Sequence, residues 1–170
     1  MSWNIHGDYM ENKSRKPTRL KNYNYSSNGV YFITLCSKNR KHIFSSIVGD
    51  GVHDVPQILL SEYGRYIEEQ LHQITSYYKN IELDTYVVMP NHIHLLLRVE
   101  NSGMSRTPSP TNSTIPSFIS TLKRFVNKKA DCDLFQRSYF DHIIRNEEDY
   151  ITHYEYIQIN PIKWAEDELY

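Results

Sequence analysis

The most informative stretch of the sequence is Met89-Pro90-Asn91-His92-Ile93-His94-Leu95-Leu96-Leu97-Arg98. The apolar run 86–88 precedes it, and Pro90-Asn91 is a pair of turn-forming residues, so we predict one strand over 81–89 and a second over 92–99. Side chains alternate faces along a strand, which places His92 and His94 on one face and Ile93 on the other. Two neighbouring imidazoles on a strand are candidate metal ligands, although two histidines at a strand end are also compatible with no ligand at all.

The hydrophobic pattern on either side of this stretch predicts alternating strands and helices. Residues 29–36 are rich in β-branched and aromatic side chains and indicate a central strand, whereas 42–55 look irregular. Apolar residues spaced three or four apart predict helices over 58–78, 117–129 and 147–159, and 135–144 is predicted to be extended. The order β-α-β-β-α-β-α predicts an α+β fold, a ferredoxin-like sandwich whose antiparallel sheet has its helices packed on one face.

The chain of 170 residues is predicted to contain a basic N-terminal arm, 1–28, followed by a single domain, 29–170. Within that domain, 101–116 is rich in proline, serine and threonine and is predicted to be an exposed mobile loop. The net charge of −1 does not indicate a uniformly basic nucleic-acid binder. The first 42 residues nevertheless carry eight lysines and arginines against two acidic residues, so a local positive face or a merely solvated surface are both possible.

The composition also excludes several classes of protein. No apolar run approaches the roughly 20 residues of a membrane span, and residues 1–19 contain no apolar segment typical of a signal peptide. Cys36 and Cys132 are far apart, which argues against a cysteine-based zinc site and favours reduced thiols. We therefore expect a cytoplasmic protein without a membrane partner.

The last predicted helix contains a second candidate group. Tyr150, Tyr154 and Ile157 are spaced to form its core stripe, and Tyr156 lies about 200° round the helix from Tyr154, away from that stripe. Asn160 stands one turn further along on the same face as Tyr156. A phenol and an amide aligned in this way are a candidate nucleophile and a candidate third metal ligand. The alternative is a surface tyrosine and a helix that ends before Pro161.

Three blocks of the sequence, 89–94, 135–145 and 156–161, together resemble a known family. This is the transposase family with one catalytic tyrosine and a His-hydrophobe-His (HUH) motif, and the branch most similar to this chain is that of the REP-associated tyrosine transposases. The resemblance extends from about residue 29 to residue 163, with the three blocks in the family's order.

The resemblance implies a metal-dependent single-stranded DNA endonuclease and strand transferase that acts at hairpin or REP-like DNA. It implies that His92, His94 and Asn160 bind a divalent ion, Mg²⁺ or Mn²⁺, and that Tyr156 is the nucleophile that forms a 5′-phosphotyrosine intermediate. A replication-type HUH nickase, or a catalytically inactive DNA-binding relative that serves the host, remains the alternative. A zinc-binding structural protein would leave Tyr156 and Asn160 unexplained.

Contacts with the DNA are expected from basic side chains, and aromatic side chains are candidates for stacking on unpaired bases. The candidate DNA-binding residues are Arg137, Arg145, Lys123, Arg124 and Lys128. His142 lies in the second block, and its role, whether near the active site, near DNA or purely structural, is left open. Both a monomer and a homodimer are compatible with the family.

Overall fold

The computed structural model describes residues 24–25, 27–49, 56–100 and 114–166. Most of the predicted basic arm, and residues 101–113 of the predicted loop, lie outside these ranges. The remaining residues of that loop, 114–116, form the first turn of a helix.

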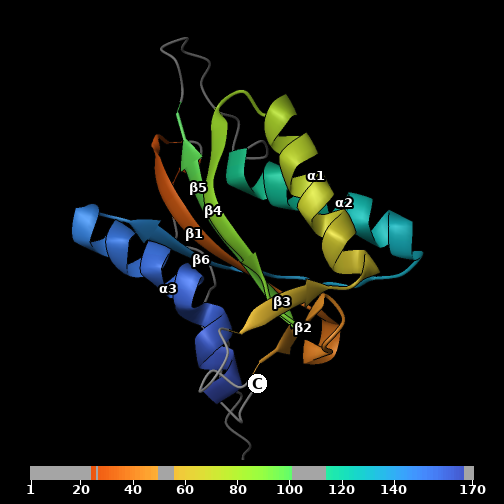
Figure 1. Ribbon diagram of the computed structural model, residues 1–170. Helices are drawn as coiled ribbons and strands as arrows, with labels where there is room; N and C mark the ends of the chain where they lie inside the picture. Colours follow the sequence, from red (N-terminus) through yellow and green to blue (C-terminus); the bar gives the residue numbers. More distant parts are fainter. Residues whose placement is uncertain (1–23, 26, 50–55, 101–113, 167–170) are drawn as a thin grey trace, which may run out of the picture.

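Four strands form an antiparallel sheet in the order β4-β5-β1-β6 (Figure 1). The strands are β1 (Gly29–Cys36), β4 (Ile81–Val88), β5 (His92–Val99) and β6 (Phe140–Ile144). Strand β5 pairs with β1 along its whole length, from His92 opposite Cys36 to Val99 opposite Gly29. Both strands have the predicted bounds, because each is an uninterrupted run of apolar and β-branched residues in the middle of the sheet.

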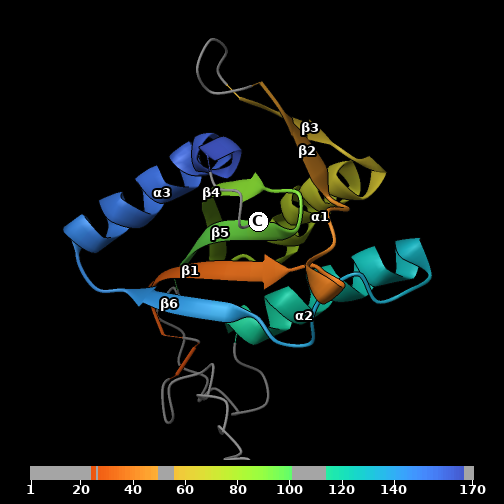
Figure 2. The same ribbon diagram turned by 90° about the horizontal axis from the view of Figure 1, so that it is seen from below.

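Three helices cover the two faces of this sheet. Helices α1 (Glu62–Tyr77) and α2 (Thr114–Ala130) lie on one face, and α3 (Glu147–Glu166) lies on the other (Figure 2). The predicted α+β class with an antiparallel sheet is confirmed, whereas the expectation that all helices pack on one face was wrong, because α3 covers the other face. Strand β5 is buried on both faces: Ile93, Leu95 and Leu97 belong to the larger core beneath α1 and α2, whereas Leu96 packs with Ile157 of α3.

The region between β1 and α1 is more ordered than predicted. Strands β2 (Ser45–Val48) and β3 (Gln57–Leu60) pair as a separate two-stranded sheet, although 42–55 were predicted to be irregular and 58–60 to be helical. Helix α1 therefore begins at Glu62, where the hydroxyl of Ser61 accepts a hydrogen bond from the backbone N–H of Gly64 at 3.0 Å. The apolar run that starts at Ile58 is compatible with either structure, which is why the sequence pattern alone misplaced the boundary.

Helix α3 is longer than predicted, because it continues through Pro161 to Glu166 instead of ending at Ile159. Proline removes one backbone hydrogen bond inside a helix, and this cost is offset by packing beyond it. The ring of Trp164 lies 5.3 Å from that of His42 and 5.9 Å from that of His92, measured between ring centroids. The continuation thus brings the end of α3 against the start of β5.

Candidate active site

His92 and His94 lie side by side on β5, on the face of the sheet that α3 covers. Their ring centroids are 4.5 Å apart, and the side chains are only 3% and 5% exposed. His92 Nδ1 donates to Asn91 Oδ1 at 2.7 Å, and His94 Nδ1 pairs with Thr34 Oγ1 at 2.9 Å. His94 Nε2 is buried and, among the described residues, has no hydrogen-bond partner. A buried imidazole nitrogen without a hydrogen-bond partner is a candidate ligand atom for a metal ion.

Asn160 reaches this pair from the opposite layer. It is 5% exposed, and its side chain forms a hydrogen bond with His92. Helix α3 runs antiparallel to β5, because Tyr150 near its start lies by Arg98 and Trp164 near its end lies by His92. Asn160, in the second half of the helix, therefore faces the start of β5. The three ligands expected from the sequence are therefore gathered in one place by a strand and a helix that are far apart in the chain.

Tyr156 lies over the same site. Its ring is half-buried, 5.2 Å from the His94 ring and 6.0 Å from the Phe32 ring, and Lys163 Nζ lies 5.5 Å from its centroid. The expectation that Tyr156 points away from the core stripe was wrong, since it packs against the core together with Ile157. Tyr154, expected in the stripe, is 39% exposed. The face that α3 buries is thus rotated from the predicted one, because it also includes the polar side chains His153 and Asn160.

Burial strongly favours the neutral form of both site histidines. It lowers the pKa of His92 from 6.5 to about 4, helped by the positive charge of Arg40 and opposed by the hydrogen bond with Asn160. It lowers the pKa of His94 from 6.5 to about 2, with further contributions from the charges of His92 and His153. Both rings are therefore neutral at pH 7, and their lone pairs are available to a cation without the release of a proton.

Arg40 is a basic residue whose charge reaches the site, although the sequence pattern counts it only among the basic residues of the N-terminal segment. Arg40 lies in the 3₁₀ turn η1 (Lys38–Arg40), and its charge acts on His92. Asn39 and Arg40 have φ angles of 58° and 55°, in the left-handed region that is uncommon for residues other than glycine. Ser37 N–H donates to Asn91 O, and Phe44 N–H donates to Pro90 O, so the segment around the turn is tied to the residues just before His92. The sequence contains no periodicity that would have revealed this link.

The five expected DNA-binding residues are not gathered in one place. Lys123 Nζ donates to the backbone carbonyls of Gln136, Arg137 and Ser138 at 2.7, 3.4 and 3.2 Å, so its ammonium holds the segment before β6. Arg137 is exposed in that segment, in the wall of a surface cavity of about 610 Å³ that Lys38 also lines.

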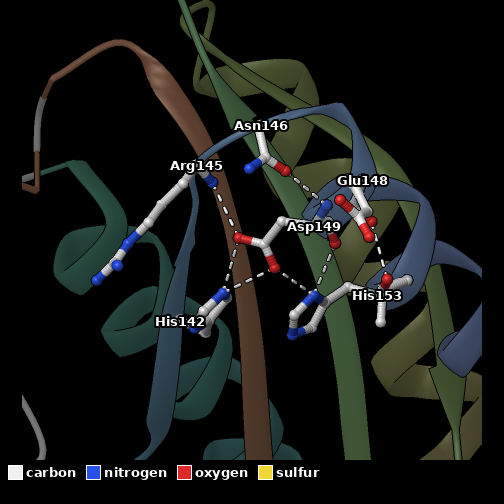
Figure 3. A network of polar contacts seen from close by, with 7 residues as sticks. His142, Arg145, Asn146, Glu148, Asp149 and His153 are labelled. Atoms are coloured by element: carbon white, nitrogen blue, oxygen red, sulfur yellow. Dashed lines mark hydrogen bonds and ion pairs between the residues drawn. The ribbon is translucent and has the colours of Figure 1, made fainter.

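The other three lie elsewhere. Arg124 and Lys128 are exposed on α2, on the opposite face of the sheet from the histidines. Arg145 is exposed just before α3, about three helical turns from Tyr156, and Figure 3 shows its side chain pointing away from the neighbouring polar cluster. His142, whose role the sequence left open, belongs to that cluster and contacts the carboxylate of Asp149.

No protein-family model matches the chain. An uncharacterized protein of Haemophilus influenzae is 35% identical over 173 residues, which cover 92% of this chain and 93% of that protein. A REP-associated tyrosine transposase of Escherichia coli is 24% identical over 141 residues, covering 82% of this chain and 70% of that protein.

Among solved structures, that of a REP-associated tyrosine transposase bound to a REP hairpin has the same fold. It superimposes with a TM-score of 0.61 at 20% identity, covering 86% of this chain and 73% of that chain. No helix in the described part of this chain is long and apolar enough to cross a membrane.

Proposed function

Because this chain belongs to the family of REP-associated tyrosine transposases, we propose that it cuts and rejoins single-stranded DNA with Tyr156 as the nucleophile. The observation that carries this proposal is the approach of Tyr156 to the histidine pair, with 5.2 Å between the rings of Tyr156 and His94. Of the three tyrosines in α3, Tyr150 donates its hydroxyl to Asp84 at 3.0 Å and Tyr154 is exposed beside it, so neither is near the histidines.

His92, His94 and Asn160 are suited to hold a divalent cation. The set of two imidazole nitrogens and one amide oxygen, together with the unpartnered His94 Nε2, fits an ion such as Mn²⁺ or Mg²⁺, and Mn²⁺ tolerates imidazole better. When bound, the ion would withdraw charge from the scissile phosphate and stabilise the leaving 3′-oxygen. Arg40, whose charge acts on His92, and Lys163, whose Nζ lies 5.5 Å from the centroid of the Tyr156 ring, would add positive charge for a bound phosphate.

The proposed reaction is an exchange of phosphodiester bonds. The Tyr156 hydroxyl oxygen attacks the phosphorus, the bond from phosphorus to the 3′-oxygen breaks, and the products are a 5′-phosphotyrosine and a free 3′-OH. Attack by another 3′-OH reverses this step and releases the tyrosine. Because the covalent link conserves one phosphoester bond, rejoining requires no nucleotide cofactor.

The proposed substrate is hairpin DNA with single-stranded flanks, on the analogy of the relative solved with a REP hairpin. Arg137 and Arg145, with the arm of residues 1–28, are proposed as phosphate contacts, and the ammonium of Lys123 supports them indirectly by holding the backbone of Arg137. A monomer and a homodimer both remain compatible with this proposal. The alternative is a replication-type HUH nickase or a catalytically inactive DNA-binding relative.

The test is covalent trapping of the protein on DNA. The full chain is incubated with labelled single-stranded hairpins in Mn²⁺ or Mg²⁺, and adducts are resolved on a denaturing gel. We expect a metal-dependent adduct that Tyr156→Phe abolishes and the matched variant Tyr154→Phe retains. Hairpin binding without an adduct in any metal would favour the inactive alternative, and an adduct that persists in Tyr156→Phe would overturn the assignment of the nucleophile.

A further inference from the structure

A second cluster of potential ligands lies on the same face of the sheet, outside the site described above. It consists of His142 from β6, and Asp149 and His153 from the first two turns of α3 (Figure 3). His142 pairs across the sheet with Phe32 of β1, and the Phe32 ring lies 4.7 Å from the ring of His153 and 5.0 Å from that of His94. Phe32 therefore separates this cluster from the HUH histidines.

The three side chains converge on one point. His142 Nε2 lies 3.0 Å from each carboxylate oxygen of Asp149, His153 Nδ1 lies 3.1 Å from Asp149 Oδ1, and all three ligand atoms lie within 4.8 Å of one another. Ligand atoms around a tetrahedral Zn²⁺ are about 3.3 Å apart, given metal–ligand distances of about 2.0–2.2 Å. Small side-chain movements would therefore suffice to admit an ion.

The surrounding structure holds these side chains in place. Arg145 N–H donates to Asp149 Oδ2 at 2.9 Å, and Asn146 Oδ1 accepts from Asp149 N–H at 2.8 Å, which fixes the start of α3 (Figure 3). The rings of His142 and His153 stack at 4.6 Å with 16° between their planes. The side chains are 35%, 20% and 22% exposed for His142, Asp149 and His153, so an ion from solvent can reach them.

We propose that His142, Asp149 and His153 form a second metal site, selective for Zn²⁺ and separate from the site at His92, His94 and Asn160. Two imidazoles and one carboxylate are a donor set that suits Zn²⁺, with water at the fourth position, and that suits Mg²⁺ poorly. The ion would join the edge strand β6 to α3, the helix that carries Tyr156, and so stabilise the packing of that helix on the sheet. This inference does not depend on the proposed DNA chemistry.

Binding would replace contacts that the cluster makes without an ion. His153 Nδ1 donates to the backbone oxygen of Asp149 at 2.8 Å, and His142 Nε2 donates to the Asp149 carboxylate. Each nitrogen must give up its hydrogen to coordinate, which a neutral imidazole does by moving the proton to its other nitrogen. These hydrogen bonds to Asp149 are partly exposed to solvent, and each such bond contributes little to stability. Coordination bonds to an ion would therefore replace them favourably.

The test isolates this cluster from the HUH histidines. Zn²⁺ binding to the full chain carrying His92→Gln and His94→Gln is measured by calorimetry, together with thermal unfolding with and without Zn²⁺. In that background we expect Zn²⁺ to bind and to raise the melting temperature, Mg²⁺ to do neither, and His142→Gln or His153→Gln to weaken Zn²⁺ binding by about tenfold or more. Co²⁺ in place of Zn²⁺ should give the visible spectrum of a four-coordinate site.

The matched control is His72→Gln, because His72 is an exposed histidine that bonds to Tyr86 and lies outside the cluster. It should leave Zn²⁺ binding unchanged. Circular dichroism in a chelator verifies that each variant is folded, and Asp149→Asn provides a further variant of nearly identical shape. Equal Zn²⁺ affinity with and without His142 and His153 would overturn the proposal, and so would the absence of a shift in melting temperature. The cluster would then only join β6 to α3 through hydrogen bonds.

Discussion

Thr34 contacts one of the proposed metal ligands through its hydroxyl. It lies opposite His94 in the β1–β5 pair, and its Oγ1 contacts His94 Nδ1 at 2.9 Å. With Nδ1 engaged in this way, the ring presents Nε2 to the site. We expect this hydrogen bond to orient the imidazole.

Thr34→Val, which keeps the shape of the side chain but removes the hydroxyl, should weaken Mn²⁺ binding by about ten- to a hundredfold. Mn²⁺ affinity is measured by electron paramagnetic resonance of the free ion. Thr75→Val is the control, because the hydroxyl of Thr75 bonds to the backbone of α1, on the other side of the sheet. Equal Mn²⁺ affinities for Thr34→Val and the unmodified protein would show that the hydroxyl does not position His94.

The buried histidines also predict how the stability of the protein depends on pH. The folded-state pKa values of His92 and His94 lie below the unfolded value of 6.5, at about 4 and about 2. The unfolded chain therefore binds protons below pH 6.5 that the folded chain does not bind, and the free energy of unfolding falls as the pH falls from 6.5 toward 4. At pH 5.5, each histidine should lower that free energy by about 1.4 kcal/mol.

This loss is measured by urea unfolding at pH 7.5 and pH 5.5 in a chelator. The variant carrying His92→Gln and His94→Gln lacks both groups, so its stability should change less between the two pH values. If the unmodified protein and the double variant lost the same amount of stability, the two histidines would not be the cause.

At the scale of the elements, the segments with one dominant pattern were predicted best. Strands β1 and β5 have the predicted bounds because each is a run of apolar residues in the centre of the sheet. Since alternation along β5 also determines the face of each side chain, the common position of His92 and His94 followed from the sequence alone. Strands β2 and β3 were missed because they are only four residues each, too short for a reliable pattern.

The faces of helix α3 were harder to predict. The face that it buries carries His153, Tyr156 and Asn160 beside Ile157, so a search for apolar spacing placed the buried stripe wrongly. Of the polar residues on this face, Asn160 is buried and His153 and Tyr156 are half-buried, and all three belong to the two proposed sites. A helix that carries a site on its inner face thus departs from the pattern that identifies ordinary amphipathic helices.

The close approach of α1 to the segment before β2 makes a second stability prediction. Gly64 is buried, and a Cβ atom on it would overlap the backbone oxygen of Phe44. That oxygen accepts from Ser61 N–H at 3.0 Å, and Phe44 N–H is bonded to Pro90, so the backbone cannot move without disturbing the turn before His92. The overlap outweighs the better helix propensity of alanine.

Gly64→Ala should therefore lower the free energy of unfolding by about 1–2 kcal/mol. Urea unfolding measures the change, and Ser76→Ala, at an exposed position of the same helix, should change stability much less. A stabilised Gly64→Ala protein would mean that α1 moves away from Phe44 at little cost.

At the scale of the whole molecule, the basic side chains are divided between the two faces of the sheet. Arg40 acts on His92, whereas Arg137 lies in a segment that is joined to β1 by the bond from Gln136 N–H to Cys36 O and to α2 by the ammonium of Lys123. Arg124 and Lys128 lie on α2, behind the opposite face. The near-zero net charge of the chain conceals this division. A strand of DNA with its phosphate at Tyr156 would reach Arg40, and we propose that it continues to Arg137 and does not reach the pair on α2.

The variant Arg40→Gln/Arg137→Gln should accordingly weaken binding of a single-stranded hairpin, whereas Arg124→Gln/Lys128→Gln, which removes the same charge, should not. Binding is measured by fluorescence anisotropy over a series of salt concentrations. For single strands, each phosphate contact contributes about 0.7 to the slope of log affinity against log salt, so the first variant should flatten that slope by up to about 1.4. The second variant should keep the slope of the unmodified protein. If both variants weakened DNA binding equally, the attraction between protein and DNA would depend on total charge and not on the face that carries Tyr156. A larger effect of the α2 pair would place the DNA on the opposite face of the molecule.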